Sequence, residues 1–209
     1  TKGKRASLAN IDQQMVRSAI SRSSTFNDSN LRSETFYNLT GIKGEERAWY
    51  SYNYKNNGTD VLNTTLYNHE DKVTLKNSSG IDQVFNIARP FQRLIGTTTY
   101  DGKVTNFADL SGEKKLSTTY NYLDNWTLTP QDELNIAGLA VERGGEIADY
   151  THDYTSNHDT YYFYGDTADQ GTKGKRASLA NIDQQMVRSA ISRYSTFNDS
   201  NLRSETFYN

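Results

Sequence analysis

One segment occurs twice in this chain of 209 residues, and that duplication limits the fold more than any other feature. Residues 1–38 and 172–209 agree at 37 of 38 positions, with an offset of 171 residues. The single difference is Ser23 in the first copy against Tyr194 in the second. Self-similarity at a fixed period is typical of repeat architectures. The chain therefore holds one body and two copies of one segment, and a body with one slot can bury only one copy.

The duplication divides the chain into three parts. They are a first copy (1–38), a β-rich body (39–171), and a second copy (172–209) that completes this unit or a neighbouring one. Three origins fit this pattern: a natural array of repeats, an engineered duplication, and the overlapping ends of a continuous fibre.

Charge is distributed unevenly over these parts. Each copy has six basic and three acidic residues, a net charge of +3, whereas the body has 11 basic and 19 acidic residues, a net charge of −8. Opposite charges attract within a screening length of about 8–10 Å. The charge pattern therefore favours docking of a copy on the body, although solvated faces of different charge would give the same numbers.

Composition excludes several classes of protein. The chain has no cysteine, which excludes disulfide scaffolds, thiolate zinc sites and thiol catalysis. Its net charge of −2 argues against a nucleic-acid partner, because such proteins are usually basic. No apolar run approaches the roughly 18 residues of a membrane helix, so the sequence predicts no membrane span.

The repeated segment has the spacing of an amphipathic helix. Apolar residues recur every three or four positions over residues 6–22 and again over 177–193. We predict that this apolar face packs on the body or on a neighbouring subunit. The predicted subunit-contact residues are Leu8, Ile11, Met15, Ile20, Leu179, Ile182, Met186 and Ile191.

Between the copies the pattern changes to short strands. Apolar and polar residues alternate over 60–67 and 72–76, aromatic residues crowd 45–54, and Asn-Gly and Asp-Gly pairs separate further candidates. Short strands at this spacing favour a sandwich or a barrel. The predicted fold class is α+β, mainly an antiparallel β sandwich or barrel with one amphipathic helix per repeat unit.

One histidine-rich stretch is the best candidate for a metal site. His152 and His158 would face each other across a hairpin if the chain turns at 155–157, and Asp153 and Asp159 adjoin them as further candidate ligands. Imidazole nitrogens would then suit a transition metal, and the Asp and Asn oxygens of the stretch would instead suit Ca²⁺. A polar surface hairpin explains the same residues without a ligand, and the sequence predicts no other cofactor.

No motif for catalysis is present. The chain contains no phosphate-binding loop, nucleophile elbow, zinc-protease helix or dinucleotide fingerprint, so we do not expect an enzyme. Its 15 tyrosines are clustered within candidate strands. Exposed tyrosine rings favour contact with neighbouring subunits, glycans or a host surface.

The organisation resembles that of large bacterial surface and biofilm proteins built from long tandem repeats. The resemblance rests on the 38-residue duplication and on the cysteine-free sequence rich in Asn, Thr and Tyr. It implies an extracellular or cell-surface fibre or adhesin that associates with itself. The repeated segment would complete the core of the body, in the same chain or in the next subunit.

Two further stretches, 106–116 (NFADLSGEKKL) and 161–168 (YYFYGDTA), look like patterns in β-barrels of the transferrin-binding-protein type. That resemblance implies a Gram-negative surface lipoprotein that captures a host protein or haem. The basic repeated segment departs from the pattern where such barrels continue.

Overall fold

A computed structural model describes residues 13–39, 43–44, 46–76, 81–86, 92–122, 146–166, 172–180, 183–194 and 196–208. Regular structure in these residues is almost entirely β, so the β-rich character is confirmed. The strands are β1 (Arg17–Ser21), β2 (Leu31–Asn38), β3 (Arg47–Tyr54), β4 (Val61–His69), β5 (Lys72–Lys76), β6 (Asp82–Asn86), β7 (Leu94–Asp101), β8 (Lys115–Tyr122), β9 (Ile147–Asp153), β10 (His158–Gly165), β11 (Lys175–Arg176), β12 (Gln185–Ser192) and β13 (Leu202–Phe207). Two short 3-10 helices are η6 (Ala177–Leu179) and η7 (Asp199–Asn201).

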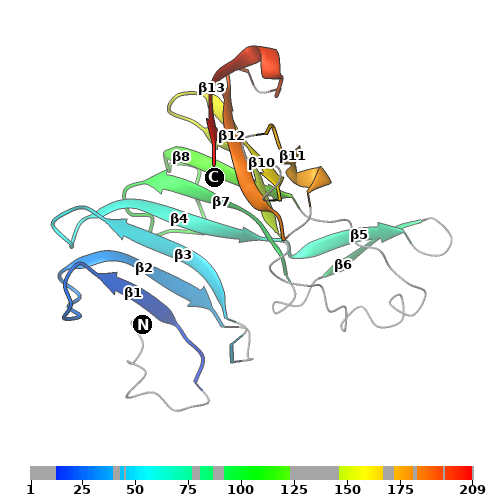
Figure 1. Cartoon of the computed structure of the whole chain (residues 1–209). Helices are drawn as coiled ribbons and strands as arrows, with labels where there is room; N and C mark the ends of the chain where they lie inside the picture. The colour runs from blue at the N-terminus through cyan, green and yellow to red at the C-terminus, as the bar shows by residue number, and fades with distance from the viewer. Residues whose placement is uncertain are drawn as a thin grey trace. The chain divides into compact units, whose positions relative to one another are not determined.

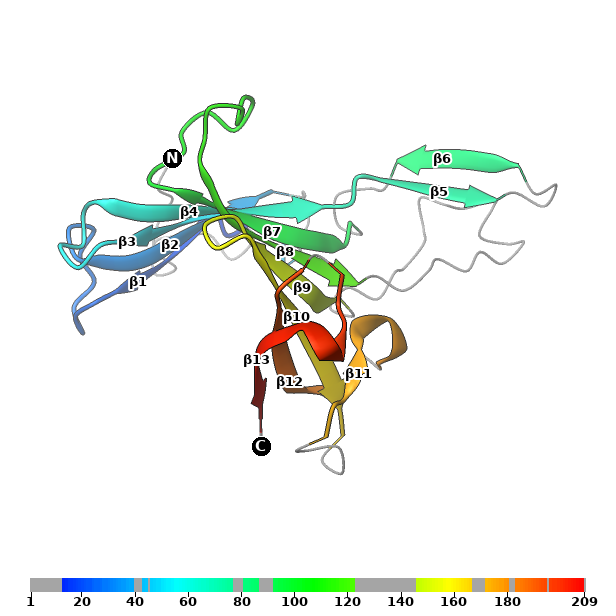
Figure 2. The same ribbon diagram turned by 90° about the horizontal axis from the view of Figure 1, so that it is seen from above.

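Eleven of the strands form one antiparallel sheet (Figure 1). Its order is β1-β2-β3-β4-β7-β8-β9-β10-β12-β13, and β11 pairs with β10. Strands β5 and β6 pair only with each other among the described residues (Figure 2). The chain divides into two compact units, one of residues 1–68 and 98–116 and one of residues 69–97 and 117–209. Each unit therefore contains one copy of the repeated segment.

The predicted fold class is wrong in its helix. Residues 17–21 and 185–192 are strands, and η6 is the only helical turn described within 177–193. Serine and β-branched residues are weak helix formers, and a helix of this length is marginal without tertiary contacts. Residues 17–21 instead pair with residues 31–36 as an antiparallel hairpin, which satisfies their backbone N–H and C=O groups.

The predicted sandwich or barrel is also corrected. The described strands form one main sheet whose pairing order has two ends, β1 and β13. Individual strand positions in the body are confirmed, because β3, β4 and β5 fall where the pattern placed them. Residues 123–145, where the pattern of short strands continues in the sequence, lie outside the described residues.

The core of the first unit lies on β3 and β4. Val104 is fully buried there, and its backbone N–H donates to the Thr64 hydroxyl over 3.0 Å. The Tyr52 hydroxyl donates to the carbonyl of Val104 over 2.7 Å. Phe107 stacks on Tyr50 with ring centroids 4.4 Å apart. The segment after β7 is thus held on the aromatic side chains of β3.

The core of the second unit lies where β10 meets β12. Tyr161, Phe163 and Ala190 are buried together, with Tyr150, Phe197 and Leu202 packed around them. Ala190, Phe197 and Leu202 belong to the second copy of the repeated segment. The second copy of the repeated segment therefore supplies part of this core, from strands and a loop.

Candidate functional site

Both copies of the repeated segment fold into the same β-hairpin. In the first copy Arg17 lies opposite Phe36, and in the second Arg188 lies opposite Phe207. All five residue pairs of one hairpin match the five pairs of the other at the sequence offset. Even the register shift recurs, just before Ser21 in one copy and just before Ser192 in the other. The hairpin is therefore a defined unit whose register does not depend on its surroundings.

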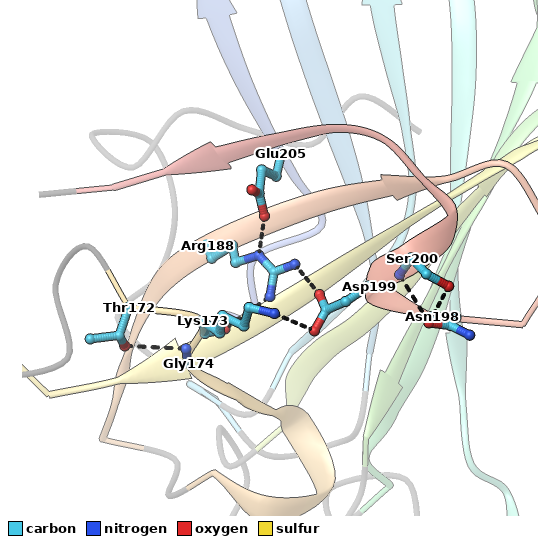
Figure 3. A network of polar contacts seen from close by, with 8 residues as sticks. All are labelled: Thr172, Lys173, Gly174, Arg188, Asn198, Asp199, Ser200 and Glu205. Atoms are coloured by element: carbon cyan, nitrogen blue, oxygen red, sulfur yellow. Dashed lines mark hydrogen bonds and ion pairs between the residues drawn. The ribbon is translucent and has the colours of Figure 1, made fainter.

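An arginine holds each hairpin together from inside. In the second copy the buried Arg188 lies 2.7 Å from Asp199, and its Nε lies 3.0 Å from Glu205 as an ion pair (Figure 3). Lys173 approaches the same Asp199 to 2.9 Å. Hydrogen bonds from Lys173 and Arg188 lower the pKa of Asp199. The turn is capped by Asn198, whose side chain accepts from the backbone N–H of Ser200.

The first copy repeats this network. Arg17 lies 2.8 Å from Asp28 and 2.5 Å from Glu34. Asn27 accepts from the backbone N–H of Ser29, as its counterpart does in the second copy. These contacts join residues within one segment, so they explain why two identical sequences reach one conformation.

The two hairpins are attached to the body by opposite edges. In the first copy the second strand, β2, pairs with β3, and β1 ends the sheet. In the second copy the first strand, β12, pairs with β10, and β13 ends the sheet. Each copy thus uses the edge that the other copy leaves at the end of the strand order.

The burial of equivalent side chains in the two copies shows the same reversal of edges. The Glu34 side chain on β2 is 7% exposed, whereas its counterpart Glu205 on β13 is 39% exposed. On the first strand the order is opposite, because Ala190 is buried while its counterpart Ala19 is half-buried, and Ile191 is half-buried while its counterpart Ile20 is 57% exposed. Leu31 at the start of β2 is buried as well. Together the two copies bury both strands of the hairpin, but neither copy does so alone.

Two phenylalanines of the segment show the same reversal, since each is packed in one copy and exposed in the other. Phe36 stacks on Tyr50 of β3 with ring centroids 4.7 Å apart, whereas its counterpart Phe207 is 43% exposed. Phe197 packs edge-on against Tyr161 of β10 at 5.2 Å, whereas its counterpart Phe26 is 38% exposed. The segment therefore carries one aromatic anchor for β3 and another for β10.

A close approach of two backbones fastens the first copy. The N–H of Leu31 donates to the carbonyl of Gly58 over 3.1 Å. Gly58 has a φ of +73°, and a Cβ there would lie 2.7 Å from the Cα of Asn30. Arg22 adds hydrogen bonds of 3.0 Å to the carbonyls of Tyr54 and Lys55. Only glycine fits this contact.

A basic residue of the second copy reaches the strands of the second unit. Arg176 donates to Asp149 over 2.6 Å, and its guanidinium lies 4.6 Å from the centroid of the Tyr161 ring. Gly174, with a φ of +63°, lets this stretch pass close to Val187. The counterparts of Arg176 and Gly174 in the first copy lie outside the described residues.

The predicted metal site forms the predicted hairpin but not a metal cluster. His152 lies opposite Asp159 on β9 and β10, with Nδ1 2.6 Å from the carboxylate. Asp153 instead accepts the N–H groups of Thr155 and Ser156 in the turn, and the bond from Ser156 is the main cause of its lowered pKa. In the described part of the chain no group of three metal-ligating side chains comes together.

His158 takes part in a contact between the body and the second copy. Its Nδ1 faces the carbonyl of Ser156, and its Nε2 lies 2.7 Å from the guanidinium of Arg203 on β13. His158 is therefore placed against the repeated segment and away from the carboxylate of Asp159, which pairs with His152.

A shallow hollow of about 380 Å³ adjoins this hairpin. It is lined by Tyr120, Tyr150, His152, Asp159, Tyr161 and Arg176. Successive rings stack on one another across β8, β9 and β10, with centroids 4.7 and 5.6 Å apart. Burial, with the nearby Asp159 carboxylate, raises the pKa of Tyr161 to about 12. The ring faces thus contact each other, and the ladder stabilises the strands that receive the second copy.

The predicted subunit-contact residues are scattered. Leu8, Ile11 and Ile182 lie outside the described residues. Four others are exposed, namely Met15, Ile20, Leu179 and Met186, and Ile191 is half-buried. The stronger contacts come from residues that the helical spacing passed over, Phe36 and Phe197 above all. Both phenylalanines lie outside residues 6–22 and 177–193, the ranges with helical spacing, so that pattern could not identify them.

Other observations set the context of the two hairpins. The described residues include no helix that is long and apolar enough to cross a membrane. Comparisons of the chain with protein-family models, with curated proteins and with solved structures find none that matches.

Proposed function

We propose that this protein is a structural repeat unit of an extracellular fibre, adhesin or biofilm-matrix protein, whose units associate through the repeated hairpin. One observation carries the proposal: identical hairpins bind the body by opposite edges in the two copies. The strand at each end of the sheet, β1 or β13, therefore has the same sequence as a strand that is paired with the body in the other copy.

Edge strands support association in general. An edge strand presents backbone N–H and C=O groups that can pair with another strand, and natural monomers usually cover or charge such edges. Here the β13 edge carries Phe207, 43% exposed, beside the half-exposed Glu205. The same sequence on β2 is paired with β3, so this edge is suited to strand pairing.

Light scattering against concentration tests the proposal. We expect the average mass of the purified chain to rise with concentration at low and at high salt, because backbone pairing is little affected by screening. A chain that stays monomeric at all concentrations would overturn the proposed function.

A matched pair of variants locates the association surface. Phe207→Asp places a charge on the β13 edge and should lower the average mass. Tyr194→Asp is the control, because Tyr194 is 63% exposed in the hairpin loop, at the one position where the copies differ. Equal effects of the two substitutions would assign the association to another surface.

A further inference from the structure

Building on the proposed function, we infer that a single hairpin bridges two bodies. Its first strand pairs with β10 of its own chain, and its second strand, β13, pairs with β3 of a second copy of this chain. The partner is thus a second copy, and the surface that it offers is the edge of β3. The mode is the addition of a strand to a sheet edge.

The register of this junction follows from the first copy. There Ser33 lies opposite Asn53, and Thr35 lies opposite Ser51. The equivalent residues of the second copy are Ser204 and Thr206, which have the same neighbours in sequence. At the junction Ser204 would therefore face Asn53, and Thr206 would face Ser51, of the second chain.

The exposed side chains of β13 each have a defined place at this junction. Phe207 would stack on Tyr50, as Phe36 does at 4.7 Å. Glu205 would receive the Tyr54 hydroxyl, as Glu34 does. The first copy thus displays the contacts that the second copy lacks.

The hairpin uses different side chains for its contacts with β10 and with β3. Contacts toward β10 are made by Ala190 and Phe197, whereas contacts toward β3 would be made by Glu205 and Phe207. The network around Arg188 joins the two strands and is present in both settings. One hairpin can therefore hold both neighbours at once.

Formation of the junction requires exchange, because β2 of the second chain already occupies β3. Residues 31–38 and 202–209 are identical, so the incoming strand replaces each contact by an equal one. Exchange of identical elements between protomers is a low-cost route to association. In a tandem chain with a period of 171 residues, one hairpin between two bodies would need no exchange.

Disulfide trapping tests the register, and the absence of cysteine gives a clean background. Four full-length single variants are made: Ser51→Cys, Asn53→Cys, Ser204→Cys and Thr206→Cys. They are mixed in pairs, allowed to associate and oxidised, and heterodimers are quantified by mass spectrometry of the disulfide-linked peptides. Because each chain carries one cysteine, every heterodimer reports pairing between chains.

In-register mixtures are S51C with T206C and N53C with S204C; the swapped mixtures serve as matched controls. Directly opposite Cβ atoms lie within disulfide reach and diagonal ones do not, so we expect about tenfold more heterodimer in register. A double variant with T35C and S51C in one chain is the positive control, because those residues are already opposite. Its internal disulfide verifies that Ser51→Cys folds and that this geometry can be bridged.

The outcomes separate the two proposals. An in-register excess supports the bridging hairpin. Assemblies seen by light scattering without an in-register excess would overturn the bridging hairpin and leave the proposed function standing. Absence of both assemblies and cross-links would overturn the two together.

Discussion

The two copies of the repeated segment form a comparison in which sequence is constant and surroundings differ. Hairpin register, the central arginine and the capped turn are the same in both copies. The buried edge and the aromatic anchor are reversed. Local sequence thus determines the hairpin, whereas the strand beside it determines which half is buried.

The largest effect is expected from a substitution that weakens the attachment of the first copy and leaves that of the second intact. Gly58→Ala combines a left-handed φ with a Cβ 2.7 Å from the backbone of Asn30. We expect a loss of about 3 kcal/mol in the free energy of unfolding, since strain and overlap add. Amide hydrogen exchange should increase in the first hairpin and stay unchanged in the second.

Gly102→Ala is the control for the strain alone. Gly102 has a φ of +68°, but a Cβ there would meet nothing within 4 Å. Its cost should be about 1 kcal/mol in the free energy of unfolding.

Peptides that contain Ser23 or Tyr194 differ in mass, so mass spectrometry can follow hydrogen exchange in the two hairpins separately. Equal losses for the two glycine variants would show that the approach of Asn30 is unimportant.

A reciprocal pair of truncations tests the division of the aromatic anchors. Phe36→Ala removes a ring stacked on Tyr50 and should cost about 2 kcal/mol in urea unfolding, whereas Phe207→Ala should stay within about 0.5 kcal/mol. For the other anchor the order reverses, with Phe197→Ala costly and Phe26→Ala nearly neutral. Similar costs within either pair would contradict the reversal of edges.

A charge substitution gives a smaller effect of the same kind. Glu34 is 7% exposed between Arg17 and Tyr54, and Glu34→Gln should cost about 1–2 kcal/mol because a buried charge loses its partner. Glu205→Gln, at 39% exposure, should cost about 0.5 kcal/mol or less. Thermal unfolding of both variants measures the difference, and the comparison fails if Glu205→Gln costs more.

The smallest effect is a dependence on pH. Hydrogen bonds from Lys173 and Arg188 lower the pKa of Asp199 in the folded protein, so the folded state binds this proton less tightly than the unfolded state. The stabilisation is present above the unfolded pKa of about 3.9 and is lost as the pH falls through the folded pKa. Asp199→Asn should therefore weaken the loss of stability between about pH 5 and pH 2.

Asp183→Asn, in an exposed turn, is the control for this titration. Urea unfolding at several pH values should give the same acid slope for Asp183→Asn as for the unchanged protein. A slope that Asp199→Asn leaves unaltered would assign the acid sensitivity to other carboxylates.

The sequence predicts the strands of the body better than the secondary structure of the repeated segment. Strands β3 and β4 are joined through an Asn-Gly turn and lie where the pattern of the sequence predicts them, so the local pattern is sufficient. Residues 17–21 lie within the helical spacing of residues 6–22, but pairing with β2 makes them a strand. That pairing depends on Arg17 reaching Asp28 and Glu34, which no local pattern reveals.

The candidate site shows the same limit. The duplication itself, read directly from the sequence, identifies the segment that matters. Its division into two edges does not follow from the sequence, because both copies have the same residues. The hairpin at 152–159 was predictable from its turn, whereas the choice of His152 as the partner of Asp159 depends on strand register.

The opposite attachment of the two hairpins gives any assembly a direction. A chain added through β13 and a chain added through β3 use different surfaces, so the contact is head-to-tail and lacks a twofold axis. Such a contact propagates without closing unless the rotation per subunit completes a ring. The two tips of a filament built this way would differ chemically, one ending in the β13 edge of a second copy and the other in a first copy still paired with β3, and each would need its own kind of cap.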